Sequence, residues 1–251
     1  MTAPLHQLDP LNRFSDRAAD YVNHRPSYPP DAIAQILSGL GDLSQLVVAD
    51  IGAGTGISSR LFGERGCRVW AIEPNAAMQA FAEPHLNVEY RLGTAEQTGL
   101  ADQSVNLVTC FQAFHWFNPE VALTEFHRIL KPSGRLALAW NGRDRSDPFT
   151  NEFGELMRQV SDKHPALDRS ESFPDHSLFP TVQDYRFTIT QVHDLAGLIG
   201  NAKSRSYVPR AGAAYEKLLN ELKGLYDRYA DPQGRVFLKY QTTVFIGDLP
   251  Q

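Results

Sequence analysis

The sequence has little of what marks several large protein classes. Its 251 residues contain only two cysteines, Cys67 and Cys110, with no C-x-x-C pair and no histidine cluster beside them. This excludes a disulfide framework and a thiolate metal site, so we expect no metal. No apolar run approaches the roughly 20 residues that span a bilayer. Residues 1–10 lack the cationic start and apolar centre of a signal peptide. We therefore expect a cytoplasmic protein with no membrane partner.

An excess of positive charge is also missing. The 24 Lys and Arg residues are outnumbered by 29 Asp and Glu residues, which gives a net charge of −5. Proteins that bind nucleic acid usually carry a basic footprint, so we expect no nucleic-acid partner. The hydrophobic fraction of 42% and the length are ample for the core of one domain.

What the sequence does contain is an alternation of strand-like and helix-like segments from residue 46 onward. Strands are expected near residues 46–51, 68–73, 87–92, 105–111, 135–140, 185–192 and 236–246. Helices are expected near residues 31–40, 55–65, 75–82, 119–130, 148–161, 194–200 and 211–229. This alternation predicts an α/β fold, a doubly wound and mostly parallel sheet with helices on both faces. The last strand follows a long helix, so we expect it to pair antiparallel within the same sheet.

A glycine-rich turn after the first strand is the most informative motif. The strand ends at Asp50-Ile51, and Gly52-Ala53-Gly54-Thr55-Gly56 follows at once. Glycines accept positive φ and let the backbone approach a ligand, and this end of the strand is where α/β proteins bind nucleotides. Ile57 stands where a dinucleotide fingerprint has its last glycine, which argues against NAD or FAD. An ordinary turn that binds no ligand remains an alternative at this point.

A carboxylate at the end of the second strand favours binding. Glu73 follows the strand of residues 68–72. Its distance of about 20 residues beyond the glycine turn suits a carboxylate that accepts hydrogen bonds from both hydroxyls of a ribose. A solvated charge is the alternative for a lone glutamate. The two features together predict a nucleotide-like cofactor.

Five further motifs follow in a fixed order along the chain. They are Tyr21-x-x-x-Arg25-Pro26-x-Tyr28-Pro29, residues 71–75 (AIEPN), 93–96 (GTAE), 112–117 (QAFHWF) and 130–136 (LKPSGRL). With the glycine turn, they resemble the class I S-adenosylmethionine-dependent methyltransferases, in particular the small-molecule group that includes trans-aconitate methyltransferase-like proteins. The resemblance implies a Rossmann-like sheet of seven strands. It also implies S-adenosyl-L-methionine as cofactor, S-adenosyl-L-homocysteine as product, a small-molecule methyl acceptor, and a monomer or homodimer.

The resemblance also implies a single domain in four parts. Residues 1–45 would form N-terminal cap helices, and residues 46–140 the cofactor-binding core. Residues 141–235 would supply a sixth strand and a helical lid, inserted after the fifth and sixth strands. Residues 236–247 would form the last strand.

Particular cofactor contacts follow from the resemblance. Gly52 and Gly54 would lie along the methionine part, and Asp50 would orient the turn or bind the cofactor's ammonium group. Relatives often carry Asp where Thr94 stands, and a hydroxyl accepts more weakly than a carboxylate. The complete cofactor set implied is Asp50, Gly52, Gly54, Gly56, Glu73, Asn75, Met78, Thr94, Ala95, Glu96, Gln112, Tyr21 and Arg25.

The side that binds the methyl acceptor is expected to include Tyr28, His115, Trp116, Arg205 and Tyr207. His115 is the candidate catalytic base, with a packed polar neighbour as the alternative, and Trp116 is core or pocket wall. A carboxylate acceptor, with a reference pKa of about 4, needs no base but benefits from arginine partners. A hydroxyl acceptor would need one. Arg143, Arg145 and Arg205 favour a small carboxylic acid, although a solvated polar turn is the alternative for Arg205.

Two functions from other classes remain open on the sequence alone. One is a Rossmann-type oxidoreductase with a nucleotide cofactor, against which Ile57 and the lack of a catalytic Tyr-x-x-x-Lys pair weigh. The other is a non-catalytic protein that binds S-adenosylmethionine. The intact glycines, Glu73, Gln112 and His115 weigh against that alternative.

Overall fold

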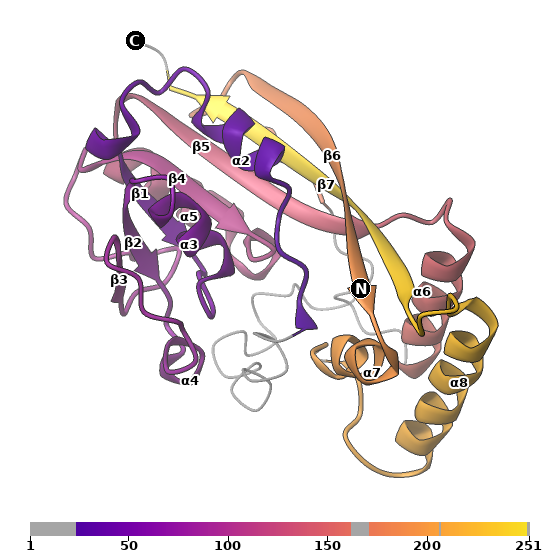
Figure 1. The fold of residues 1–251 in the computed structure, drawn as a ribbon. Helices are drawn as coiled ribbons and strands as arrows, with labels where there is room; N and C mark the ends of the chain where they lie inside the picture. The colour runs from indigo at the N-terminus through magenta and orange to yellow at the C-terminus, as the bar shows by residue number, and fades with distance from the viewer. Residues whose placement is uncertain (1–23, 162–170, 206, 250–251) are drawn as a thin grey trace.

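The computed structural model describes residues 24–161, 171–205 and 207–249, and a seven-stranded sheet runs through its centre (Figure 1). The strands are β1 (Val47–Ile51), β2 (Arg68–Ile72), β3 (Val88–Arg91), β4 (Val105–Phe111), β5 (Leu130–Arg143), β6 (Val182–His193) and β7 (Val236–Asp248). Their order is β3-β2-β1-β4-β5-β7-β6. Strands β1 to β5 are parallel to one another, and β7 lies antiparallel between β5 and β6. The predicted fold class is therefore confirmed.

The strand order locates where a ligand should bind. From β1 the chain builds outward to β2 and β3, and it then returns to place β4 on the other side of β1. Ligands of open α/β sheets bind beyond the carboxyl ends of the strands at such a reversal. In this chain that position is occupied by the residues after β1 and β4, which are the glycine turn and Gln112.

Helices cover both faces of the sheet. They are α2 (Pro30–Leu37), α3 (Ile57–Gly63), α4 (Ala76–Gln79), α5 (Pro119–Ile129), α6 (Pro148–Val160), α7 (Leu195–Lys203) and α8 (Ala213–Tyr229). Successive strand residues point to opposite faces. Val48 thus packs in the same apolar cluster as Ile33 of α2 and Phe62 of α3, whereas Ala49 belongs to the cluster of Phe126 on α5. Both faces are covered, so the parallel strands are almost continuous apolar runs.

Helices α6, α7 and α8 form a separate unit. Figure 1 shows them grouped at the end of the long strands β5, β6 and β7, away from α2, α3 and α5. They share an apolar cluster of their own, which includes Phe153 of α6, Leu198 of α7 and Leu222 of α8. Strand β5 ends at this unit, so the three helices lie at the end of the sheet where the parallel strands have their carboxyl ends.

Several elements differ in length from the prediction. Strand β5 begins at Leu130 rather than Arg135, because Leu130 already pairs with Val105 before a register shift in the ladder. It continues to Arg143 because β7 supplies an antiparallel partner as far as Tyr240. Strand β6 likewise begins at residue 182 and follows β7 along its whole length. None of the helices in the described ranges is long and apolar enough to cross a membrane.

Candidate active site

The glycine turn after β1 adopts a backbone that requires glycine. Gly52, Gly54 and Gly56 have φ of 69°, 58° and 82°, all in the left-handed region. A Cβ on Gly52 would lie 2.7 Å from the Cβ of Ala113, and one on Gly56 would collide with the Tyr90 hydroxyl. The turn is therefore tightly packed at the carboxyl end of β1, and the N–H groups of Gly52, Gly54 and Gly56 donate to Ile72 O, Glu73 Oε2 and Ala53 O.

Replacing Gly56 with alanine should destabilise the protein more than strain alone explains. A left-handed alanine costs about 1–2 kcal/mol, and the collision with Tyr90 should add about 1–3 kcal/mol of overpacking. Gly66 is the matched control, because its φ is 92° but no atom lies within 4 Å of a built Cβ. Urea unfolding of Gly56→Ala, Gly66→Ala and Gly56→Ala/Tyr90→Phe measures the difference. The double variant should recover most of the extra loss, and equal losses in both alanine variants would contradict the packing account.

Asp50 lies beneath the turn. It is fully buried and accepts hydrogen bonds from Ser58 Oγ at 2.7 Å, Ser59 Oγ at 2.6 Å and Thr109 Oγ1 at 2.8 Å. Burial raises its pKa, and the three hydroxyls oppose that shift. The carboxyl group thus joins β1 to the start of α3 and to β4. These contacts favour the orienting role predicted for Asp50 over direct contact with a cofactor ammonium group.

Glu73 connects the glycine turn to the end of β2. Its two carboxylate oxygens accept from Gly54 N at 2.8 Å and Asn75 N at 2.9 Å. Burial raises the pKa of Glu73, and these two N–H groups oppose the shift. A carboxylate has about four lone-pair sites, so this one retains capacity for two hydroxyl donors. The residue fits the ribose-binding role predicted for it.

The residues predicted around the adenine follow β2 and β3. Asn75 caps α4 by accepting from Ala77 N at 2.9 Å, and Met78 is buried against Gly54. The remaining three lie after β3: Ala95 is buried, Thr94 accepts from Gln97 N, and Glu96 accepts from Asn118 N at 2.9 Å. Because β2 and β3 are parallel neighbours, these two groups stand side by side at one edge of the sheet.

Gln112 stands at the end of β4 in a strained conformation. Its φ is 56°, a region that costs a residue with a side chain about 1–3 kcal/mol and that concentrates at functional sites. Its Nε2 donates to Asn141 O at 3.0 Å. Gln112 also lines two cavities, which share Arg25, Pro26, Gln112 and Asn141. The smaller cavity lies over Gly52 and Ala53, and the larger one has a volume of about 390 Å³.

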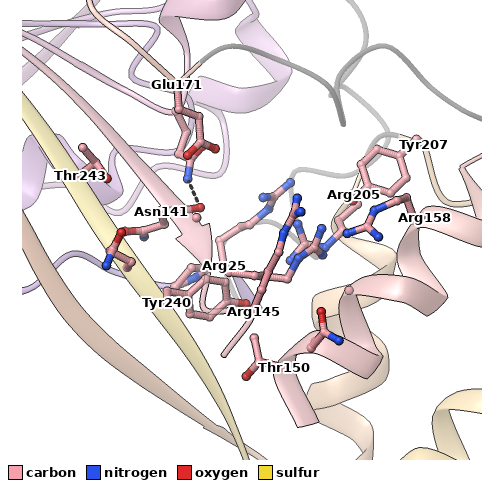
Figure 2. A pocket seen from close by; sticks show the side chains of 17 residues that line it. Arg25, Asn141, Arg145, Thr150, Arg158, Glu171, Arg205, Tyr207, Tyr240 and Thr243 are labelled. Carbon is pink, nitrogen blue, oxygen red and sulfur yellow. Dashed lines mark hydrogen bonds between the residues drawn. The ribbon is translucent and has the colours of Figure 1, made fainter. Parts of the chain in front are cut away.

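The larger cavity is lined by arginines. Figure 2 shows guanidinium groups that come from separate parts of the chain and converge in its middle. The arginines that line it are Arg25, Arg143, Arg145, Arg158 and Arg205. Among the described lining residues the only carboxylate is Glu171. Like charges in one cavity repel, so this arrangement favours an anionic ligand that offsets them.

Arg143 and Arg205 are the most enclosed of these arginines. Arg143 Nη1 is buried and has no hydrogen-bond partner among the described residues. Burial and the nearby charge of Arg205 lower the pKa of Arg143 to about 10, so it stays charged at neutral pH. Arg205 is 9% exposed and donates to Asn201 Oδ1 at 3.1 Å. A buried unpaired donor costs about 1–3 kcal/mol, and an anion in the cavity would remove that cost.

Two asparagines hold the N-terminal segment between the cavities. Asn141 Nδ2 donates to Ser27 O at 3.1 Å, and Asn201 Nδ2 donates to His24 O at 2.9 Å. Arg25 Nη2 reaches Ser204 O at 3.3 Å. Segment 24–28 is thereby fixed to the end of α7 and to β5. Tyr21, which the sequence placed at this site, lies outside the described residues.

The predicted acceptor residues do not all meet. Arg205 and Tyr207 line the larger cavity, and Tyr28 lines the smaller one. His115 and buried Trp116 line neither. His115 Nδ1 accepts from Trp140 Nε1 at 3.3 Å. A neutral imidazole that accepts at Nδ1 carries its proton on Nε2. This contact argues against His115 as the base, and its catalytic role stays a prediction.

Three residues of this site were missed by the sequence reasoning. Asn141 lies beyond the predicted fifth strand, and its place near a strand's carboxyl end was a usable signal. Arg158 lies on α6 and Tyr240 on β7, and each is one of several residues of its type in the chain. No local pattern distinguishes either one, because only the packing of α6 and β7 brings both to the cavity.

Comparison with known proteins matches the sequence of this chain to one family. A family model described as "Methyltransferase domain" matches residues 49–138. An uncharacterized methyltransferase of Mycobacterium tuberculosis is 37% identical over 195 residues, which cover 77% of this chain and 76% of the relative.

Solved structures agree in fold. A structure described as a type II methyltransferase from Anaeromyxobacter dehalogenans has a TM-score of 0.66 at 24% identity, covering 90% of this chain and 99% of its own. A phosphoethanolamine N-methyltransferase of Haemonchus contortus, in complex with S-adenosylhomocysteine, has a TM-score of 0.54 at 16% identity. That match covers 100% of this chain and 61% of the other.

Proposed function

The chain belongs to the class I S-adenosylmethionine-dependent methyltransferases, and we propose that it methylates a carboxylate oxygen of a small anionic acceptor. The observation that carries the acceptor class is the arginine-lined cavity, which adjoins the cavity over the glycine turn. The match to methyltransferases gives no support to the oxidoreductase alternative. The finer resemblance to trans-aconitate methyltransferase-like proteins stays a prediction.

The residues present fit the cofactor. Its sulfonium supplies a methyl group that can be displaced in line by a nucleophile. The backbone of Gly52 and Gly54 would hold the amino-acid tail, and Glu73, with its remaining lone pairs, the ribose hydroxyls. Gln112 lines both cavities and would stand between cofactor and acceptor.

The arginines would orient the acceptor. A carboxylate, with a reference pKa of about 4, is ionised at neutral pH and needs no base. The chain then has to hold its oxygen in line with the methyl group, and orientation of this kind can contribute roughly 7–11 kcal/mol. An acceptor of this class is compatible with the hydrogen bond that occupies His115 Nδ1. A hydroxyl acceptor would need a base, and the one carboxylate among the described lining residues of the larger cavity is Glu171.

Two measurements test the proposal. Thermal-shift titration with S-adenosylhomocysteine, NAD and NADP should show stabilisation by the first alone, about 2.7 kcal/mol at 100 times its Kd. Methyl transfer from labelled S-adenosylmethionine is then assayed on small carboxylic acids and on matched alcohols. A carboxylate product is a methyl ester and releases methanol in mild alkali, whereas an ether does not. Alkali-stable products would contradict the carboxylate, and binding without any transfer would favour the non-catalytic alternative.

A further inference from the structure

The hydroxyl of Tyr207 lies among the arginines of the larger cavity. Tyr207 lines this cavity together with Arg25, Arg143 and Arg205, and the positive charges of these three arginines act on its hydroxyl. These three arginines come from β5, from the residues after α7 and from the N-terminal segment. Three parts of the chain therefore direct positive charge at one phenol oxygen.

An acceptor carboxylate would have the same partners. Arginines bind carboxylates through short, charge-assisted hydrogen bonds that are roughly twice as strong as neutral ones. The phenol oxygen of Tyr207 and an acceptor oxygen would compete for the positive charge of Arg143 and Arg205, which line the same cavity. Tyr207 would therefore act as a competitor of the acceptor rather than as one of its ligands.

We propose that Tyr207 is a specificity-determining residue, whose hydroxyl fills the anion position of the arginine cluster and must be displaced by the acceptor's acidic group. The inference rests on the proposed function. Only a ligand with a full negative charge gains enough from the guanidinium groups to replace the phenol. Alcohols and amides of similar shape would not displace it, so the cluster would select for acids.

The ionisation of Tyr207 gives this competition a pH dependence. Burial by itself would raise the pKa of Tyr207, but the charges of Arg205, Arg143 and Arg25 outweigh it and lower the pKa. A neutral phenol yields to a carboxylate, whereas a phenolate neutralises the same guanidinium groups. Acceptor affinity should therefore fall as the pH rises through this lowered pKa.

Other charged and titratable groups face the same cavity. Tyr240 on β7 lines the cavity with Arg205, and Arg145 and Arg158 line it from just before α6 and from α6 itself. Glu171 lies close to Gly142, and Figure 2 shows the arginines between it and Tyr207. Arg143, with its pKa of about 10, begins to lose charge only in more alkaline solution. From neutral pH to pH 9 Arg143 therefore keeps most of its charge, so a change in acceptor affinity over this interval is not due to Arg143.

Calorimetric titration with malonate as the probe tests the inference on the full chain saturated with S-adenosylhomocysteine. Tyr207→Phe should bind malonate more tightly than the wild type, with a Kd that is the same at neutral pH and at pH 9. The wild-type Kd should rise by up to about tenfold per pH unit above the pKa of Tyr207, because binding takes up one proton. Tyr185→Phe, on β6, is the matched control and should follow the wild type.

The outcomes separate the two proposals. Weaker or equal malonate binding by Tyr207→Phe, while the wild type binds, overturns this inference and leaves the proposed function standing. Absence of binding by both proteins overturns the anionic acceptor as well. If Tyr207→Phe fails to fold, a measurement on the wild type alone still tests the inference. At a pH where the wild-type Kd has risen, malonate should reduce the ultraviolet absorbance of tyrosinate, since a displaced Tyr207 regains its proton, and an unchanged absorbance contradicts displacement.

Discussion

Replacing Arg143 with alanine should raise the KM for a carboxylate acceptor about 100-fold, with little change in the affinity for S-adenosylhomocysteine. Arg143 lines the larger cavity but not the one over the glycine turn, and its Nη1 is buried without a partner among the described residues. Removing one partner of a buried, hydrogen-bonded charge pair costs about 2–5 kcal/mol. The 100-fold effect corresponds to about 2.7 kcal/mol, near the lower end of that range.

Steady-state kinetics and calorimetry measure the effect. Arg228→Ala is the control, because Arg228 lies on α8 and forms an exposed ion pair with Glu152. Surface pairs of this kind contribute about 0–1 kcal/mol, so its kinetics should match the wild type. Arg205→Ala should also raise the KM, although it also removes the hydrogen bond to Asn201. An unchanged KM in both cavity variants would contradict the carboxylate proposal.

Replacing Glu73 with glutamine should weaken the binding of S-adenosylhomocysteine about 10- to 100-fold. Hydrogen bonds to a charged acceptor contribute about 1.5–3 kcal/mol, and the amide retains only one oxygen. That oxygen cannot serve both Gly54 N and Asn75 N, so the turn loses a constraint as well. The result would be a higher cofactor Kd with acceptor KM values changed much less, which calorimetry and kinetics together would measure.

The raised pKa of Glu73 adds a pH signature to this prediction. The carboxylate forms only above that raised pKa, so wild-type affinity for S-adenosylhomocysteine should increase as the pH rises through it and fall below it. Glu73→Gln should lack this dependence. Glu89→Gln provides the control, since Glu89 is exposed on the neighbouring strand β3 and forms an ion pair with Arg91. A variant Glu73→Gln that keeps both the wild-type Kd and its pH profile would argue against ribose binding at this residue.

The contact between the glycine turn and Glu73 could be predicted because both are local features. Gly52, Gly54 and Gly56 lie in one turn, and Glu73 ends the next strand along the chain. Parallel neighbours in a βαβ unit place their carboxyl ends together, so spacing alone brought Glu73 to the turn. The strands and helices were predicted close to their observed positions. Strand-like and helix-like segments alternate along the chain, as they do where helices cover both faces of a parallel sheet.

The acceptor side could not be derived in the same way. The sequence singled out Arg25 by its motif and Arg143, Arg145 and Arg205 as candidates for binding an acid, but it gave no reason to bring them together with Arg158. Their convergence depends on β7 pairing antiparallel with β5, which extends β5 to Arg143, and on α6 and α7 packing around the end of these strands. His115 shows the opposite case. Its position in a loop after β4 predicted catalysis, whereas its hydrogen bond with Trp140 argues for a structural role.

The sequence by itself thus determined the α/β fold and the place of the glycine turn and of Glu73 at neighbouring strand ends. These features arise from backbone preferences and from the geometry of adjacent elements. Only the tertiary structure decided that five arginines and Tyr207 share one cavity beside that turn. Charges far apart in the chain meet there because the apolar packing of β7, α6 and α7 fixes their positions, and a linear pattern carries no record of that packing.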